Sequence, residues 1–260
     1  MNANKDFKLG YCEQNRLESW FDSRLGQLLL AQEQACLEEK VAAIFGYHVV
    51  QIGAPSPHFD LLRQSPARNR VVLDSLAGQS DISLRADPRS LPLAGDSIDG
   101  VILPHTLDFS SDPHRLVREV ERVLIPEGKV LLSGFNPWSQ WGLGHLFLRR
   151  SGRMPWCSNF FSSKRVQDWF SLLGFDLEEV IHLNYRPPLH SQMVMQKLAF
   201  MERLGERVWP LLGSVYVIQA VKRTVTMTPI RTKWRVKKRV MPTAAEPTAR
   251  SRSTFNDAIR

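Results

Sequence analysis

The chain has 260 residues, of which 43% are hydrophobic and 23% charged, as expected for a globular protein with a core of useful size. Its net charge of +8 lies at one end, because residues 222–260 hold eleven basic and two acidic side chains and the first 221 residues are nearly neutral. Residues 1–10 are polar and no stretch of 18 apolar residues occurs; we therefore expect no secretory signal, no transmembrane segment and a cytoplasmic location. Three widely spaced cysteines without a CxxC motif indicate reduced thiols rather than a disulfide framework or a zinc site.

Apolar periodicity predicts strands that alternate with helices along most of the chain. The pattern is typical of an α/β fold with a mostly parallel seven-stranded sheet, helices on both faces and an antiparallel last strand. Asp112 and Pro113 form an N-cap and first-turn pair that marks one helix start. The expected strands are 47–53, 70–74, 82–86, 98–104, 129–135, 175–183 and 215–222, and the expected helices are 19–45, 59–63, 113–124, 163–173 and 191–204.

The composition changes after Arg223 to Thr, Pro, Ala, Arg and Lys. Such a segment has too few apolar residues to offset the entropy of ordering, so we expect disorder there. The predicted organisation is an N-terminal extension, 1–18, a folded domain, 19–223, and a basic tail, 224–260. The tail is either simply solvated or contacts nucleic acid or an anionic surface.

Candidate ligand-binding residues follow the strands, because ligands of open parallel α/β sheets sit outside the carboxyl ends of the strands. Gly53 follows the first strand and allows close approach of the backbone to a ligand. Asp74 ends the second strand, and Asp87 comes just after the third. Carboxylates at these positions accept hydrogen bonds from ribose hydroxyls and from an adenine amino group.

The stretch from Ala86 to His105, Ala-Asp-Pro-Arg-Ser-Leu-Pro-Leu-Ala-Gly-Asp-Ser-Ile-Asp-Gly-Val-Ile-Leu-Pro-His, resembles the middle of type-11 class I S-adenosylmethionine-dependent methyltransferases. That family includes ubiquinone and menaquinone biosynthesis enzymes. The continuation from Arg118, Arg-Glu-Val-Glu-Arg-Val-Leu-Ile-Pro-Glu-Gly-Lys-Val-Leu-Leu, strengthens the resemblance. Gly134-Phe-Asn-Pro-Trp-Ser139 looks like an uncharacterised proteobacterial subgroup. The resemblance covers roughly residues 47–183 and implies a Rossmann-like fold with S-adenosylmethionine as cofactor.

The resemblance also implies a role for each matching residue. Asp87 matches the adenine-amino acceptor, with Pro88 beside the ring, and Asp74 matches the ribose acceptor. Gly53 matches the first glycine of the cofactor loop. The end of the fourth strand, which in the family faces the methionine part of the cofactor and the incoming substrate, is matched by Leu103, Pro104 and His105.

The cofactor loop departs from the family pattern. Gln51 stands where the family has an acid, and Ala54-Pro-Ser-Pro57 replaces the other glycines. A Gln amide oxygen still accepts a hydrogen bond from the methionine ammonium, but without charge assistance, a loss of about 1–2 kcal/mol. The connection from Asp74 to Asp87 is also too short for a full helix.

The implied chemistry is an in-line displacement at a sulfonium methyl, which requires alignment and water exclusion rather than a metal or a covalent nucleophile. His105, with Asp108 three residues later, is the candidate general base, although a structural histidine is the competing interpretation. His105, Asp108 and His114 do not have the spacing of a metal site. The residues expected to line an acceptor pocket are Phe135, Asn136, Trp138 and Trp141.

Three functions remain open from the sequence. The first is a methyltransferase acting on a small-molecule acceptor. The second is a non-catalytic binding module in which the altered loop, 51–57, no longer holds the cofactor. The third is an RNA-directed methyltransferase that uses the basic tail as a clamp.

Overall fold

The protein is described from a computed structural model, which covers residues 19–54, 59–74, 83–148, 154–186, 207 and 209–223. These residues belong to the first of two compact units, Met1–Val225; the second is Thr226–Arg260. The predicted N-terminal extension, the helix expected at 191–204 and the basic tail lie outside the described residues, so the domain boundaries remain predictions. Within the described part, no helix is both long and apolar enough to cross a membrane.

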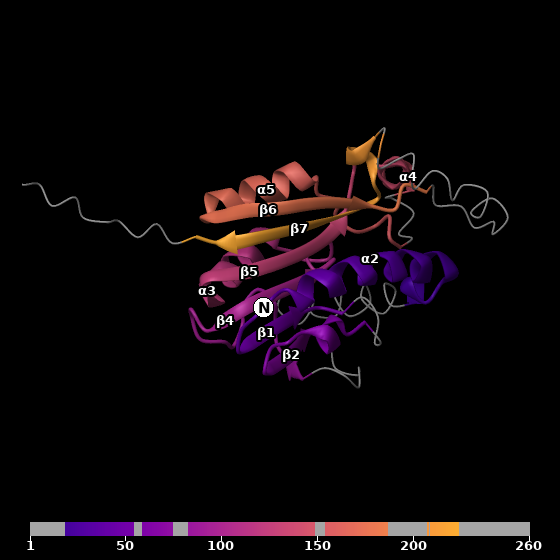
Figure 1. Ribbon diagram of the computed structural model, residues 1–260. Coiled ribbons are helices and arrows are strands. Elements are labelled where there is room, and N and C mark those ends of the chain that lie inside the picture. The colour runs from indigo at the N-terminus through magenta and orange to yellow at the C-terminus, as the bar shows by residue number, and fades with distance from the viewer. Residues whose placement is uncertain are drawn as a thin grey trace, which may run out of the picture. The chain divides into compact units, whose positions relative to one another are not determined.

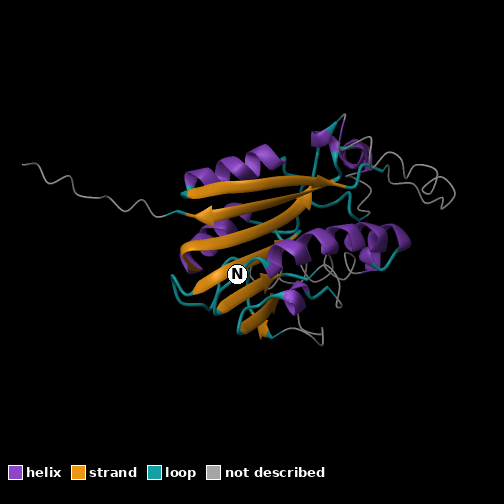
Figure 2. Ribbon diagram, in the orientation of Figure 1, coloured by secondary structure: helices purple, strands orange, loops and turns teal. Residues whose placement is uncertain are grey.

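Seven strands form one sheet in the order β3-β2-β1-β4-β5-β7-β6 (Figures 1 and 2). The first five strands along the chain pair in parallel, whereas β7 runs antiparallel to both β5 and β6. The predicted mostly parallel sheet with an antiparallel last strand is thus confirmed. The strands are β1 His48–Ile52, β2 Asn69–Asp74, β3 Leu84–Arg85, β4 Ile98–Pro104, β5 Leu124–Phe135, β6 Phe175–Leu183 and β7 Val215–Lys222.

Helices cover both faces of the sheet, and local sequence signals mark where they begin. The Ser23 side chain caps α2 by accepting from the Gly26 N–H, and Asp112 caps α3 with Pro113 in its first turn, as side chains with oxygen acceptors do at helix starts. The helices are α2 Arg24–Ala42, α3 Pro113–Val123, α4 Gln140–Leu148 and α5 Ser163–Leu172, with 3₁₀ turns η1 Leu61–Gln64 and η3 Pro210–Leu212.

The core has two layers, one on each face of the sheet, because successive strand residues point to opposite sides. Val50 and Val101 face α3 and α5, whereas Val49 and Ile102 face α2 and α4. Figure 1 shows α2 lying along one face, and its N-terminal half extends toward the carboxyl ends of the parallel strands. This placement brings side chains of α2 to the edge where a ligand is expected.

Several elements differ from the sequence prediction. β5 begins at Leu124 instead of residue 129, and the helix expected at 59–63 is the 3₁₀ turn η1. The third strand has only two residues, Leu84 and Arg85, which pair with Leu73 and Asp74. A helix, α4, forms where no element was predicted; both its buried and its exposed positions carry apolar residues, so its sequence lacks the pattern of an amphipathic helix.

Candidate functional site

The ends of β1 and β2 lie side by side and are joined by hydrogen bonds. Gly53, at φ 83°, donates its N–H to the Leu73 carbonyl, and the next N–H, of Ala54, donates to the Asp74 carboxylate at 3.2 Å. The Asp74 side chain is buried. Its strand-end position agrees with the prediction, and it also fixes the backbone of the loop after β1.

Gln51 is fully buried and its amide is committed to that loop. The amide nitrogen donates to the carbonyls of Gly53 and Phe59, and the amide oxygen accepts the Leu61 N–H. The Gln51 side chain thus gives hydrogen-bond partners to three backbone groups of the connection between β1 and η1. The polar atoms of Gln51 thus hold the start of η1, and a role for Gln51 in cofactor binding stays a prediction.

Asp87 follows β3 and is half-exposed. Both of its carboxylate oxygens accept hydrogen bonds from the Arg89 guanidinium, which also donates to the Ser111 hydroxyl. The Arg89 side chain lowers the pKa of Asp87, so this carboxylate is ionised at neutral pH. Pro88 sits between them in the turn.

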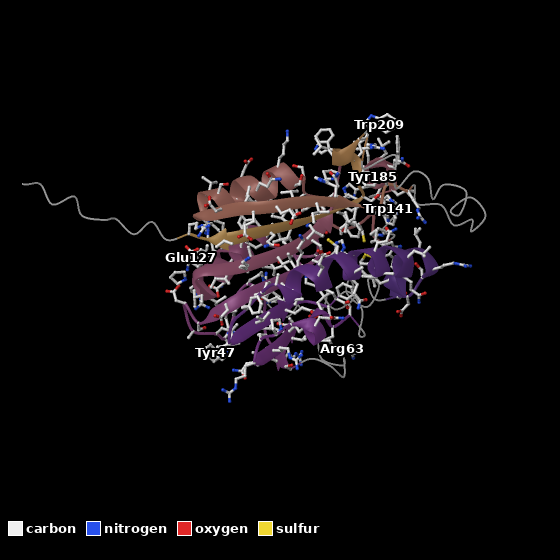
Figure 3. All side chains as sticks on the ribbon, in the orientation of Figure 1. Tyr47, Arg63, Glu127, Trp141, Tyr185 and Trp209 are labelled. Carbon is white, nitrogen blue, oxygen red and sulfur yellow. The ribbon has the colours of Figure 1, made fainter. Side chains whose placement is uncertain are left out.

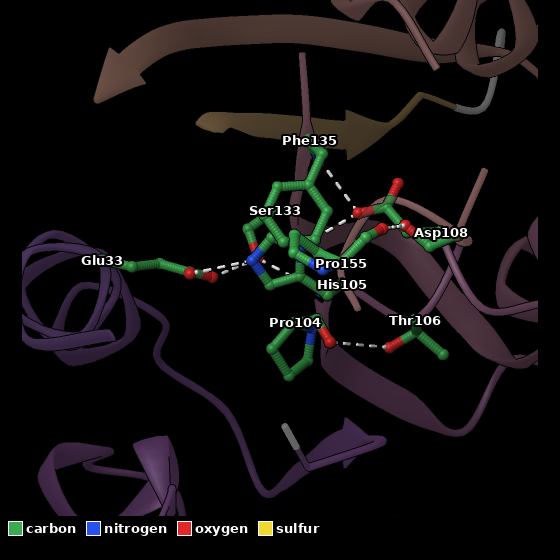
Figure 4. Close-up of polar contacts among 9 residues, drawn as sticks. Glu33, Pro104, His105, Thr106, Asp108, Ser133, Phe135 and Pro155 are labelled. Atoms are coloured by element: carbon green, nitrogen blue, oxygen red, sulfur yellow. Dashed lines mark hydrogen bonds and ion pairs between the residues drawn. The ribbon is translucent and has the colours of Figure 1, made fainter. Parts of the chain in front are cut away.

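The end of β4 is a buried polar cluster that we call the His105 network (Figure 4). His105 is only 1% exposed. Its Nε2 lies 3.0 Å from a Glu33 carboxylate oxygen and its Nδ1 lies 2.9 Å from Asp108. Ser133 on β5 donates to the other Glu33 oxygen, and Asp108 also accepts the Phe135 N–H. The network thus joins α2 to the ends of β4 and β5.

The electrostatics of the His105 network favour an imidazolium between two carboxylates. Burial by itself would lower the pKa of His105, but the charge of Glu33 and the hydrogen bonds that the ring donates to Asp108 and Glu33 raise it to about 10. Burial raises the pKa of Asp108 to about 6, against the opposing effect of His105. His105 also has a left-handed backbone, φ 54°, a conformation that bulky residues adopt only when their surroundings enforce it.

His105 was predicted to act as a general base, and this geometry does not favour that role. Both ring nitrogens are engaged and the ring is sealed under Phe135, whose centroid lies 4.2 Å away. A base must reach the proton that it removes. His105 instead corresponds to the structural histidine that the sequence left as an alternative, and it holds α2 on the sheet.

Of the other residues predicted to contact cofactor or acceptor, three are buried and one is exposed. Leu103 packs in the core, and Pro104 is buried beside Thr106, which hydrogen-bonds its carbonyl. Asn136 is buried, and its amide donates to the carbonyls of Leu211 and Gly213. Trp138 is 74% exposed and is not among the described residues that line the cavity between α2 and α4.

A cavity of about 430 Å³, which we call the α2–α4 cavity, lies between α2, α4 and the residues that follow β6. Trp141 is its predicted aromatic wall; the ring is buried, and the indole N–H donates to the Arg186 carbonyl. Phe135 lies behind Trp141, with centroids 6.3 Å apart. The described lining is completed by Leu25, Leu28, Ala31, Gln32, Ala35, Asn184 and Arg186.

Glu33 and Arg186 were not identified from the sequence. Glu33 had a detectable signal, because it lies on the same helix face as Leu29 and Leu37, four residues away on either side. A carboxylate in an apolar stripe indicates a buried partner. Arg186 had no comparable signal, since it follows a strand without a motif.

The strand-end residues fit the adenosine part of S-adenosylmethionine. Asp74 and Asp87 are acceptor groups at the ends of neighbouring strands, as hydroxyl and amino donors require, and Gly53 has the positive φ of a backbone that turns close to a ligand. The methionine ammonium has no matching acid after β1, where Gln51 is already bonded to backbone.

The chain is similar in sequence to a family of known proteins and to one protein of Escherichia coli. Residues 55–132 match the family model described as a methyltransferase domain. YafS, an uncharacterised protein of Escherichia coli K12, is 35% identical over 211 residues, 81% of this chain and 83% of YafS.

Solved structures share the fold at low sequence identity. A Thermotoga maritima S-adenosylmethionine-dependent methyltransferase, described as a possible histamine N-methyltransferase, has a TM-score of 0.56 at 17% identity, over 80% of this chain and 95% of its own. An S-adenosylmethionine-dependent methyltransferase from Archaeoglobus fulgidus has a TM-score of 0.54 at 16% identity, over 79% and 97%. With the family match and the strand order, these findings confirm the predicted Rossmann-like fold, and the chain belongs to the type-11 family of S-adenosylmethionine-dependent methyltransferases.

Proposed function

We propose that the protein transfers a methyl group from S-adenosylmethionine to a small acceptor that has an apolar body and a negative charge. The observation that carries the proposal is the α2–α4 cavity. Its size is within the range of small-molecule sites. Its described lining is mostly apolar, and Arg186 is the only charged residue in that described lining.

The cavity is at the same edge of the sheet as the strand-end acids. Trp141 follows the end of β5, and Arg186 follows the end of β6. Because β6 runs in the same direction as β5, both segments leave the sheet where β1 and β2 also end. An acceptor in this cavity and a cofactor over Gly53 would therefore share one edge.

S-adenosylmethionine supplies a methyl group already activated on a sulfonium, which transfers by in-line displacement. Asp74 and Asp87 would hold the adenosine part through hydrogen bonds to their carboxylates. The apolar walls from Leu28 and Trp141 would exclude water from the acceptor, and the His105 network would keep α2 in place. The contribution of the chain is then alignment and desolvation.

An ionised acceptor needs no general base in the described lining of the cavity. The described lining of the cavity includes neither a carboxylate nor an imidazole, and His105 is sealed. A carboxylate, thiolate or phenolate needs no proton removed at the moment of transfer. Arg186 would favour the ionised form, because a nearby cation lowers the pKa of an acid.

The cofactor half of the proposal is tested by thermal melts with S-adenosylhomocysteine. A ligand at 100 times its dissociation constant stabilises by about 2.7 kcal/mol, or a few degrees. We expect Asp87→Ala to abolish the shift and Asp168→Ala, which removes an exposed acid on α5, to retain it. A shift that persists in Asp87→Ala would contradict the role of that residue.

The acceptor half is tested by methyl transfer to a panel of carboxylates, thiols and phenols with apolar substituents, alongside neutral amines. We expect Arg186→Gln to lower kcat/KM for ionised acceptors about tenfold or more, the order of one charge-assisted hydrogen bond. Arg63→Gln, at an exposed arginine of η1, is the control. Turnover confined to amines, unchanged by Arg186→Gln, would refute an anionic acceptor.

One observation favours the alternative of a non-catalytic binding module: all the hydrogen bonds described for the Gln51 side chain are to the backbone of the loop after β1. It predicts no melting shift with S-adenosylmethionine or its product at millimolar concentration, in a sample that unfolds cooperatively.

The RNA-directed alternative depends on the basic tail, which lies outside the described residues. Removal of residues 224–260 tests it, because loss of RNA retention at low salt is expected only if the tail is a clamp.

A further inference from the structure

Asn184, the residue that follows β6, lies in the wall of the α2–α4 cavity and is 9% exposed. Its backbone carbonyl accepts the Ser214 N–H, and its side-chain oxygen accepts the Arg186 N–H at 3.2 Å. Among the described residues, none accepts a hydrogen bond from its amide nitrogen, Nδ2. Figure 3 shows Tyr185, the next residue, at the same end of the molecule as Trp141, whose indole N–H donates to the Arg186 carbonyl.

The turn at Asn184 accounts for its side-chain oxygen and its backbone, but not for its amide nitrogen. Asn184 has φ 57°, a left-handed conformation that Asn and Asp adopt more readily than other non-glycine residues. The turn needs only the oxygen, so an aspartate would make it equally well. The Arg186 N–H also fixes the orientation of the amide, because Nδ2 cannot accept it. Compared with an aspartate, Asn184 therefore gives the cavity a hydrogen-bond donor and no negative charge.

A second amide lies in the wall that α2 contributes. Gln32 is the one polar residue among the described α2 residues of the lining, which are otherwise Leu25, Leu28, Ala31 and Ala35. Gln32 is partly buried, and its side chain makes no hydrogen bond within the described part of the chain. A polar group that loses water without gaining a partner costs free energy. An amide in each of two walls therefore indicates a ligand that accepts hydrogen bonds from both.

We propose that Asn184 is a specificity-determining residue that binds an oxygen of a carboxylate on the acceptor. A carboxylate has two oxygens with about four lone-pair sites, which match amide donors on two walls beside the positive charge of Arg186. A thiolate offers a single sulfur, which is a weak acceptor, and a phenolate offers one oxygen. This inference rests on the proposed function and narrows its anionic acceptor to one class.

The experiment is an NMR titration of the full chain, with S-adenosylhomocysteine present, using phenylacetate, hexanoate and octanoate as probes. The alcohols with the same carbon skeletons serve as neutral counterparts. We expect the carboxylates to bind more tightly than the alcohols. Asn184→Asp keeps the oxygen and the left-handed backbone but removes the donor, and it should weaken the carboxylates about tenfold or more, as for loss of a charge-assisted hydrogen bond. Binding of the alcohols should be unchanged, because an aspartate accepts from a hydroxyl.

Two further variants separate loss of the donor from added charge. Asn184→Gly removes the donor without adding charge, and glycine tolerates the positive φ; we expect it to weaken the carboxylates several-fold. Asn69→Asp is the matched control, because it adds the same charge at an exposed residue at the start of β2, the opposite edge of the sheet. We expect it to bind every probe as the unchanged protein does.

Three results would overturn the inference. The first is a set of carboxylates that bind no better than their alcohols, and the second is equal weakening by Asn184→Asp and Asn69→Asp. The third is an equal loss of alcohols and carboxylates in Asn184→Asp, which would give Asn184 a structural role only. Methyl transfer to thiols or phenols that Asn184→Asp leaves unchanged would also reject the inference while the proposed function stands. Lack of any melting shift with S-adenosylhomocysteine would instead refute the proposed function.

Discussion

β1 and β4 are neighbours in the sheet, and the buried polar side chains at their ends are stabilised by different kinds of contact. At the end of β4, His105 is held by two buried carboxylates, one of them Glu33 from a helix 72 residues earlier. At the end of β1, Gln51 is equally buried but neutral, and it bonds only to backbone within ten residues. The end of β4 is therefore stabilised by charge pairs with residues distant in the sequence, and the end of β1 by hydrogen bonds within one local loop.

Because their contacts differ in strength, we expect the ends of β4 and β1 to differ in how readily they move. A buried charged group left without its partner is far more costly than a lost neutral hydrogen bond. The β4 end, with α2 fixed on it, should therefore be the rigid side of the edge. The β1 end, where a cofactor is expected, depends on weaker local bonds and should be the adaptable side.

The largest expected effect comes from removing the carboxylate that α2 supplies. Glu33→Ala leaves His105 and Ser133 without a buried partner, and we expect a loss of about 3–5 kcal/mol in unfolding free energy. Glu39→Ala, on the exposed side of the same helix, should change stability by less than about 0.5 kcal/mol. Urea denaturation measures both. Similar losses in the two variants would show that the β4 end is not held by charge pairing.

The pH dependence of stability should report the same network. The pKa of His105 is raised in the folded state to about 10, above its ordinary value near 6.5. Its stabilising contribution is therefore complete below about pH 6.5 and is lost as the pH rises toward 10. We expect the unfolding free energy to fall over this window by an amount on the order of a few kcal/mol. A flat profile across pH 7–10 would contradict an imidazolium in the network.

At the β1 end a smaller effect is expected. Gln51→Ala removes three hydrogen bonds to backbone and leaves the buried carbonyls and N–H unpaired, which costs about 2–3 kcal/mol. Gln51→Glu restores the acid typical of the family but loses the amide donors to Gly53 and Phe59. We expect it to destabilise the protein without improving the melting shift with S-adenosylhomocysteine. Tighter cofactor binding by Gln51→Glu would show that the loop reorganises readily.

The smallest effect should come from the exposed pair that links α2 to β6. Lys40 and Glu179 lie 2.5 Å apart and both are partly solvated. Lys40→Ala should change the unfolding free energy by less than about 1 kcal/mol, as is usual for surface ion pairs. Urea denaturation in low and high salt checks this. A loss as large as that of Glu33→Ala would mean that α2 is held equally along its length.

The sequence predicted the apolar framework well and the polar contacts poorly. The bounds of β4, β6 and β7 were predicted correctly, because long apolar runs between turn residues leave little choice of where a strand begins. Helix α4 was missed, since apolar residues on all of its sides remove the periodic signal. The strand-end acids followed from chain order, but the partnership of Glu33 with His105 required the tertiary fold, because no local spacing connects them.

The direction of β7 determines at which edge of the sheet this strand ends. β7 runs against β5 and finishes at Lys222, whose ammonium contacts Asp96 and the carbonyls of Glu121 and Leu124. Lys222 therefore anchors the amino-terminal edge of the parallel strands, opposite Gly53 and the α2–α4 cavity. A fluorophore or a surface tether attached at Arg223 would leave the ligand edge facing away from the support, which is the orientation that immobilised binding measurements require.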